Sequence, residues 1–264
     1  MVSPAVTFHT AHLQTGIRLR YAAQGASDAP AVLMLHGATD SWFSFSRVLS
    51  LLPPDLRAVV PDQRGHGDSD KTASDFTLDS MAADAVALLD TLGISRAIVV
   101  GHSMGSLVAQ RVAAMAGDRV MSLLLLGSAT TARNDVVLDL VGEVDKFEDP
   151  VSVDFISAFQ ASTIHRPVPR EFFDTVVSES LKVPARVWKS AFRSLFDSPS
   201  VAVPSTCPVS ILWGDRDSLF SLWDQEALRR HIPTASFAAL KDVGHSPHWE
   251  VPDVVVREMV GILV

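Results

Sequence analysis

The chain has 264 residues, of which 47% are hydrophobic, and its formal net charge is −8. This length fits one large α/β domain or two small ones, and the apolar content excludes a disordered chain. The acidic balance disfavours nucleic acid as a partner, and no apolar run reaches the ~20 residues that a membrane span needs.

The beginning of the chain and its cysteine content indicate a compartment. The first 16 residues lack the basic and apolar regions of a secretory signal, and Cys207 is the only cysteine. We therefore expect a cytoplasmic protein without disulfides.

From residue 17 to residue 127 the sequence alternates short apolar runs with amphipathic stretches. Apolar runs of strand length are typical of buried strands, and apolar residues spaced three and four apart are typical of helices. Such alternation predicts a parallel sheet with helices on both faces. The pattern predicts strands at 17–23, 31–37, 57–65, 97–101 and 122–127, and helices at 41–52, 77–92 and 104–116.

The pattern changes between residues 130 and 204, where no convincing strand occurs. Prolines there separate helical stretches at 134–147, 150–161, 169–182 and 184–196. The alternation then resumes with strands at 207–215 and 235–240 and helices at 221–231 and 252–263. We expect an α/β fold with a mostly parallel, doubly wound sheet. Its core domain comprises residues 1–129 and 205–264, and the helical insertion, residues 130–204, forms a cap over the carboxyl ends of the strands.

The sequence Gly-His-Ser-Met-Gly at residues 101–105 joins a predicted strand to a predicted helix. In this position Gly-x-Ser-x-Gly is typical of a nucleophile elbow, a strained turn that holds the serine hydroxyl clear of the sheet near a helix N-terminus. Glycines at both ends allow the close backbone approach that the turn requires. Ser103 is therefore the candidate nucleophile.

A nucleophilic serine needs a base, and the base needs an acid that fixes its tautomer. His245 follows the last predicted strand and so lies at the same edge of the sheet as the elbow, with His248 as the nearby competitor. Asp215 and Asp217 follow the preceding strand. We favour His245 as the base, and Asp217 as the acid because it lies further out in its loop. The order Ser, Asp, His is the one expected for this arrangement.

An acyl-transfer site also needs two hydrogen-bond donors for the oxyanion. The backbone N–H of Ala38 lies in the turn after the strand at 31–37, and that of Met104 lies at the start of the helix after the elbow. These two groups are the candidate donors.

Five stretches, in this order, resemble motifs of the α/β-hydrolase fold: HGATDSW, PDQRGHGDSD, GHSMGS, WGDRDSLF and VGHSPHWEVP. The resemblance covers nearly the whole chain and says little about residues 130–204. It implies a serine esterase or lactonase with Ser103, Asp217 and His245 as its catalytic residues. A serine at this position argues against haloalkane dehalogenases and epoxide hydrolases, which require a carboxylate. Two departures are Ser106, where a glycine often follows the elbow, and HGATD in place of a triple glycine, which disfavours bulky tertiary-alcohol esters.

We expect hydrolysis of a carboxylic ester or lactone with an apolar or aromatic group. No cofactor or metal is expected, because the sequence has no ligand-spaced Cys/His cluster and no phosphate-binding glycine loop. Carbon–carbon bond hydrolysis of a diketone, cofactor-free perhydrolase or haloperoxidase-like activity, and a non-catalytic ligand-binding protein stay open. The expected pocket lining is Gly37, Trp42, His102, Trp188, Phe192 and Leu219.

Overall fold

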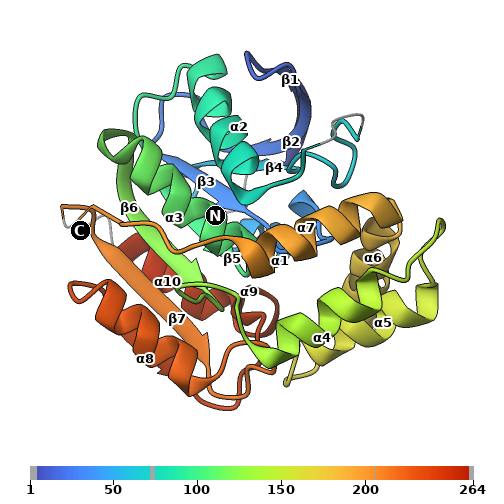
Figure 1. The fold of residues 1–264 in the computed structure, drawn as a ribbon. Helices are drawn as coiled ribbons and strands as arrows, with labels where there is room; N and C mark the ends of the chain where they lie inside the picture. Colours follow the sequence, from blue (N-terminus) through green and yellow to red (C-terminus); the bar gives the residue numbers. More distant parts are fainter. Residues whose placement is uncertain (1–4, 72–74, 205, 262–264) are drawn as a thin grey trace.

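The computed structural model describes residues 5–71, 75–204 and 206–261. Its strands form one eight-stranded sheet in the order β1-β2-β4-β3-β5-β6-β7-β8 (Figure 1). Strands β1 and β2 pair antiparallel with their neighbours, and all other pairs are parallel, which confirms a mostly parallel sheet. The strands are β1 (Thr7–His12), β2 (Arg18–Gln24), β3 (Ala31–Leu35), β4 (Arg57–Pro61), β5 (Ala97–His102), β6 (Val120–Leu126), β7 (Val209–Gly214) and β8 (Ser236–Leu240).

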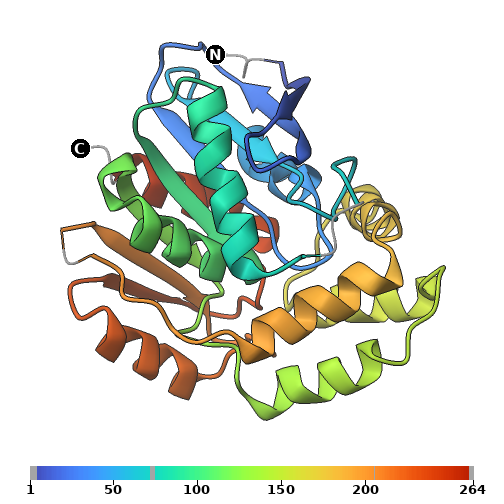
Figure 2. The ribbon, with the colours of Figure 1, turned by 45° about the horizontal axis from the view of Figure 1, so that its top comes forward.

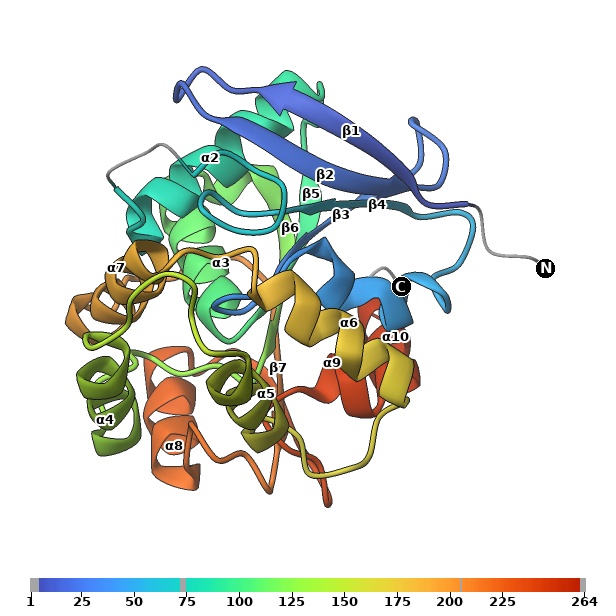
Figure 3. The same ribbon diagram turned by 90° about the vertical axis from the view of Figure 1, so that its right-hand side faces the viewer.

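Helices cover both faces of the sheet, as expected for a doubly wound fold (Figure 3). Helices α2, α3 and α8 lie on one face, and α1, α9 and α10 lie on the other. The α-helices are α1 (Ser46–Leu49), α2 (Leu78–Thr91), α3 (Met104–Met115), α4 (Asp135–Val144), α5 (Val153–Ser162), α6 (Arg170–Ser180), α7 (Ala185–Asp197), α8 (Leu222–His231), α9 (Pro247–Glu250) and α10 (Pro252–Gly261), and the 3₁₀ turns are η1 (Trp42–Phe45) and η2 (Gly117–Arg119).

Two apolar clusters form the core, one on each face of the sheet. Every residue of β5 is buried. Val99 belongs to the cluster under α2 and α3, whereas Ile98 and Val100 belong to the cluster under α1 and α10. Because successive strand residues point to opposite faces, a strand covered on both sides must be apolar throughout, which explains its continuous hydrophobic run.

The centre of the sheet is the point where the direction of winding reverses. Strand β3 pairs with β4 on one side and with β5 on the other, and β5 in turn pairs with β6. The chain therefore turns one way after β3 and the other way after β5. In open α/β sheets a crevice opens at the carboxyl ends of two such strands. The loop that begins at His36 and the turn at Ser103 lie at these ends.

The segment 130–204 contains helices α4 to α7 and no strand. The four helices lie together beyond the carboxyl ends of the parallel strands (Figures 1 and 2). Two of these helices begin at a side-chain N-cap. The Asn134 side chain accepts from Val137 N at the start of α4, and the Ser152 side chain accepts from Phe155 N at the start of α5.

The structure differs from the expected elements in the N-terminal half of the core. Strand β1 was not expected; in it only Ala11 is buried. The expected helix at 41–52 is instead the 3₁₀ turn η1 followed by the short helix α1. The expected end of the last helix, residues 262 and 263, lies outside the described residues. None of the helices in the described ranges combines the length and apolar character needed to cross a membrane.

Candidate active site

Ser103 occupies the corner between β5 and α3 with φ 51° and ψ −119°, a backbone conformation that residues other than glycine rarely adopt. A Cβ at residue 101 would overlap Gly105 O, and a Cβ at residue 105 would overlap Leu35 O. Only glycine fits at either position. The sequence therefore folds here into a tight strand–turn–helix corner that holds the serine in a strained conformation.

Hydrogen bonds fix this corner to the neighbouring strand. Ser103 N donates to Leu126 O at the end of β6 (3.0 Å), and the N–H groups of Ser106 and Leu107 donate to Ser103 O (2.9 and 3.3 Å). The Ser106 hydroxyl lies 2.6 Å from Ser103 O and 2.8 Å from Ser128 Oγ. The serine that departs from the common glycine thus adds a tie between the turn and the end of β6.

His245 and Asp217 form a buried pair at the same edge of the sheet. The Nδ1 of His245 lies 2.9 Å from Asp217 Oδ2. The other carboxylate oxygen, Oδ1, accepts from Leu219 N (2.8 Å) and Phe220 N (2.9 Å). Because the carboxylate only accepts, Nδ1 carries the proton and Nε2 has a free lone pair. Nε2 is buried and has no hydrogen-bond partner among the described residues.

The two competing side chains have other partners. Asp215 accepts from Asp242 N through Oδ1 (2.7 Å), so it ties the loop after β7 to the turn after β8. His248 is fully buried, and its Nε2 lies 2.9 Å from Ser44 Oγ. Among the described residues, neither the Asp215 nor the His248 side chain is hydrogen-bonded to Ser103, Asp217 or His245.

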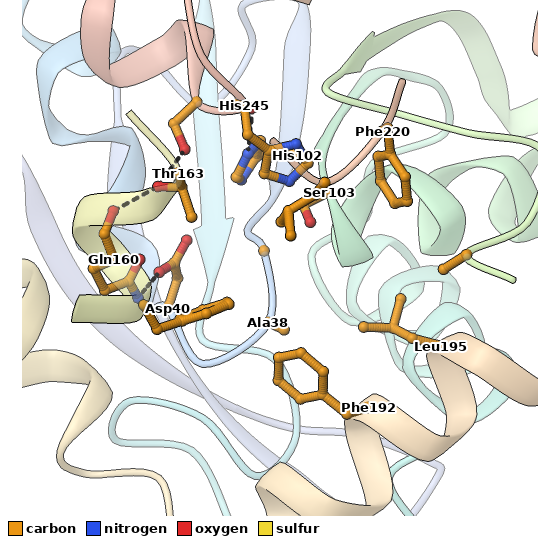
Figure 4. A pocket seen from close by; sticks show the side chains of 15 residues that line it. Ala38, Asp40, His102, Ser103, Gln160, Thr163, Phe192, Leu195, Phe220 and His245 are labelled. Carbon is orange, nitrogen blue, oxygen red and sulfur yellow. Dashed lines mark hydrogen bonds between the residues drawn. The ribbon is translucent and has the colours of Figure 1, made fainter. Parts of the chain in front are cut away.

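A small cavity brings the candidate residues together (Figure 4). Ser103 and His245 both line it, and so does Ala38. Figure 4 shows Asp40, Gln160 and Thr163 on one side of Ser103 and Phe192, Leu195 and Phe220 on the other. The complete lining is Gly37, Ala38, Asp40, His102, Ser103, Ala132, Phe159, Gln160, Thr163, Phe192, Leu195, Leu219, Phe220, His245 and Ser246.

Two residues expected in the pocket lie elsewhere, whereas Gly37, His102, Phe192 and Leu219 do line the cavity. Trp188 is fully buried on α7, because its ring packs against phenylalanines of the segment 130–204 and fills the space between the helices. Trp42 turns away toward β1, where its ring packs edge-on against Phe8. These two expectations are corrected.

The polar side of the cavity was not anticipated from the sequence. Asp40 is buried and accepts from Ser44 Oγ through Oδ2 (3.0 Å) and from Gln160 Nε2 through Oδ1 (3.1 Å). Burial raises the pKa of Asp40 to about 7, and its hydrogen bonds with Ser44 and Gln160 oppose the rise. The only signal in the sequence was an acidic residue in the turn after β3, since Gln160 is about 120 positions away.

His102 lies beside His245 with its ring in the cavity wall. Its Nε2 lies 3.1 Å from the carbonyl oxygen of His245, so Nε2 carries the proton, and its buried Nδ1 has no partner among the described residues. Burial, together with the neighbouring His248 and His245, lowers the pKa of His102 well below its usual value. His102 is therefore neutral, with an unprotonated nitrogen facing the region of Gly37.

The described residues contain no group of three or more His, Cys, Asp or Glu side chains that could hold a metal ion. The chemistry that the cavity itself can support is nucleophilic attack by a hydroxyl with a histidine as base. Both groups face the same enclosed space.

Comparisons with known proteins agree with the fold. A family model described as alpha/beta hydrolase fold matches residues 30–252. Among curated proteins, epoxide hydrolase 4 of Mus musculus is 33% identical over 114 residues, which are 42% of this chain and 32% of the relative. The matched stretch thus spans about a third of the length of that relative.

Solved structures match over nearly their whole length. An esterase from Exiguobacterium antarcticum superimposes with a TM-score of 0.87 at 18% identity, covering 98% of this chain and 100% of that one. An enol-lactonase from Burkholderia xenovorans gives a TM-score of 0.80 at 20% identity, covering 97% and 99%. With the family match over most of its length, the chain belongs to the alpha/beta hydrolase fold family.

Proposed function

We propose that the protein is a serine hydrolase that cleaves a carboxylic ester or lactone through an acyl-enzyme on Ser103. One observation carries the proposal. The strained serine and a histidine with a free Nε2 line one cavity, and a buried carboxylate fixes the histidine in the tautomer that a general base needs.

In the first half of the reaction, Ser103 Oγ attacks the ester carbon while His245 Nε2 takes its proton. The C–O double bond becomes a C–O⁻ single bond. The backbone N–H groups of Ala38 and Met104 then bind the oxyanion. The N–H of Met104 is available for this, because the hydrogen bonds described in the elbow use the N–H groups of residues 103, 106 and 107. His245 returns the proton to the leaving alkoxide, and the acyl-enzyme remains.

In the second half, His245 removes a proton from water, and the hydroxide attacks the acyl carbon. The tetrahedral intermediate collapses, the proton goes to Ser103 Oγ, and the carboxylic acid leaves. Asp217 stays ionised and stabilises the imidazolium in both halves. We also propose that residues 130–204 form a cap domain over this site, because Phe159, Gln160 and Phe192 of that segment line the cavity.

Epoxide hydrolysis, suggested by the names of several relatives, fits the site less well. Attack of a serine oxygen on an epoxide carbon would give an ether. An ether has no carbonyl to which water can add, so the enzyme would not be regenerated. A carboxylate nucleophile avoids this problem by giving an ester, but residue 103 is serine.

Replacing Ser103 by alanine tests the proposal. We expect the hydrolysis of a short-chain aryl ester to fall by about 10⁴-fold or more. We also expect a fluorophosphonate probe to label the native protein at Ser103 and to leave the variant unlabelled. Retained turnover in a variant with an unchanged circular dichroism spectrum would overturn the assignment.

A further inference from the structure

Three polar side chains that line the cavity have hydrogen-bond acceptor capacity that the described residues do not fully use. Gln160 uses its Nε2 to reach Asp40 Oδ1 and Ser180 Oγ (3.1 and 2.9 Å), and its Oε1 accepts from no described residue. The Nδ1 of His102 is unprotonated and unpartnered. Asp40 Oδ1 accepts one hydrogen bond and has a second lone pair. A buried acceptor without a donor, such as His102 Nδ1, is costly, so a ligand that supplies a donor is stabilised here.

The His102 ring and the Asp40 carboxylate both lie close to Gly37. A Cβ built on Gly37 would lie 2.9 Å from His102 Nδ1 and 3.3 Å from Asp40 Oδ2. Both side chains therefore pack against Gly37, and a side chain at this position would collide with the His102 ring. Gly37 immediately precedes Ala38, and His102 immediately precedes Ser103. A group bound between the acceptors thus lies within a few bonds of the carbonyl that Ser103 attacks.

The opposite side of the cavity has a different character. Phe192, Leu195 and Phe220 lie there (Figure 4), and Ala132 and Leu219, which also lack side-chain hydrogen-bonding groups, line the cavity as well. In the described part of the chain no lysine or arginine lines the cavity. A carboxylate on the substrate would therefore meet Asp40 without a compensating cation, whereas a donor would be accepted.

We propose that Asp40, His102 and Gln160 form a subsite that binds a hydrogen-bond donor of the substrate, a hydroxyl or a protonated amine. The donor lies close to the scissile carbonyl, and a small apolar group lies against the opposite wall. This inference rests on the proposed ester hydrolysis and adds the class of substrate. It selects hydroxy or amino esters over their unsubstituted and carboxylated counterparts.

The test compares matched esters on the native enzyme. On the acyl side, methyl butyrate is compared with methyl 3-hydroxybutyrate and methyl 3-aminobutyrate, and on the alcohol side ethyl butyrate is compared with 2-hydroxyethyl butyrate. Rates are followed by pH-stat at about pH 8, above the pKa of Asp40 of about 7. We expect the ester that carries the donor to have a kcat/KM about tenfold or more above that of its unsubstituted counterpart. This preference should appear either for the acyl-side pairs or for the alcohol-side pair. Equal values for every pair would overturn the subsite.

Variants identify the acceptor and the donor. Asp40→Leu should abolish the preference, whereas Asp40→Asn, which keeps one oxygen, should abolish it for the amine and reduce it less for the hydroxyl. The matched control is Asp62→Asn, because Asp62 is also a buried carboxylate, holds the N–H groups of Trp42 and Asp68, and lies outside the cavity wall. The control should keep the preference, whatever it does to stability.

Two further measurements keep the result interpretable. Gln160→Met removes an acceptor while keeping the length of the side chain, so it replaces the Asp40 variants if these do not fold, and it should also reduce the preference. Fluorophosphonate labelling of Ser103 separates the two proposals. A labelled enzyme whose preference is unchanged in the Asp40 and Gln160 variants contradicts the subsite alone, and an unlabelled enzyme contradicts the proposed function.

Discussion

His245 Nδ1 and Asp217 Oδ2 lie 2.9 Å apart across 28 positions of sequence, and both side chains are almost completely buried. Two backbone N–H groups hold the other oxygen of the same carboxylate. The carboxylate is therefore fixed by its own loop, and it in turn fixes the ring. This arrangement leaves Nε2 facing the cavity that Ser103 shares.

The first prediction distinguishes the two aspartates of this loop. Asp217→Asn should lower kcat by about 10⁴, because an amide presents a donor to Nδ1 and favours the wrong tautomer. Asp215→Asn should leave kcat within about tenfold of the native value, since the Asp215 carboxylate accepts from Asp242 N in the turn after β8 and lies near the exposed Arg216. Steady-state kinetics on the two variants checks this, and the reverse order of effects would move the role to Asp215.

The second prediction distinguishes the two histidines. His245→Gln should reduce kcat by about 10⁴–10⁶, as expected for the loss of the general base. His248→Gln removes a buried ring that lies 2.9 Å from Ser44 Oγ, so it should lower the melting temperature more than it lowers kcat. Kinetics and thermal unfolding are measured on both. A fully active His245→Gln variant would be incompatible with the proposed mechanism.

The third prediction concerns the glycines of the elbow. Gly105→Ala places a methyl group onto Leu35 O, a backbone atom that cannot move aside, and should destabilise the fold by about 3 kcal/mol. The control is Gly142→Ala in α4, where a Cβ meets no atom within 4 Å. Alanine there should stabilise the protein by about 0.5–1 kcal/mol. Urea unfolding measures both, and equal stabilities would contradict the packing described for the elbow.

The fourth prediction follows from the raised pKa of Asp40. Between 3.8, the ordinary value, and about 7, the folded protein binds a proton at Asp40 that the unfolded chain does not. The contribution of Asp40 to stability therefore falls as the pH rises through this window, by at most roughly 4 kcal/mol. Asp40→Asn cannot titrate and lacks this loss.

The free energy of unfolding of both proteins, measured in urea at several pH values between about 4 and 7, isolates the effect. Buried histidines contribute equally to the two proteins and cancel in the difference. The native protein should lose stability relative to Asp40→Asn as the pH rises. Parallel curves would show that Asp40 titrates normally in the folded state.

The sequence predicted most of the sheet and the residues at its carboxyl edge, because both leave local signals. Buried parallel strands are continuous apolar runs, and the elbow requires glycine on both sides of Ser103. The positions of Asp217 and His245 followed from strand ends, since parallel strands bring their carboxyl ends to one edge. Strand β1 left no such signal, because five of its six residues are exposed.

The cavity wall could not be predicted in the same way, because it depends on side chains that meet across long separations. Gln160 reaches Asp40 from α5, and nothing in either local sequence indicates the contact. Two aromatic residues of α7, Trp188 and Phe192, are expected from the sequence to line the pocket. Trp188 instead lies inside the packing of the segment 130–204, whereas Phe192 of the same helix lines the cavity. Helical periodicity identifies an apolar face but not what that face covers.

The central claim is that the substrate forms a covalent ester with Ser103, and rapid-quench mass spectrometry tests it most directly. The native enzyme is mixed with an excess of a short-chain aryl ester and quenched in acid, and the intact protein and its peptides are weighed. We expect a transient mass increase equal to the acyl group, located on the peptide that contains Ser103. Turnover without an adduct, with an adduct on another residue, or with an undiminished adduct in Ser103→Ala would contradict it.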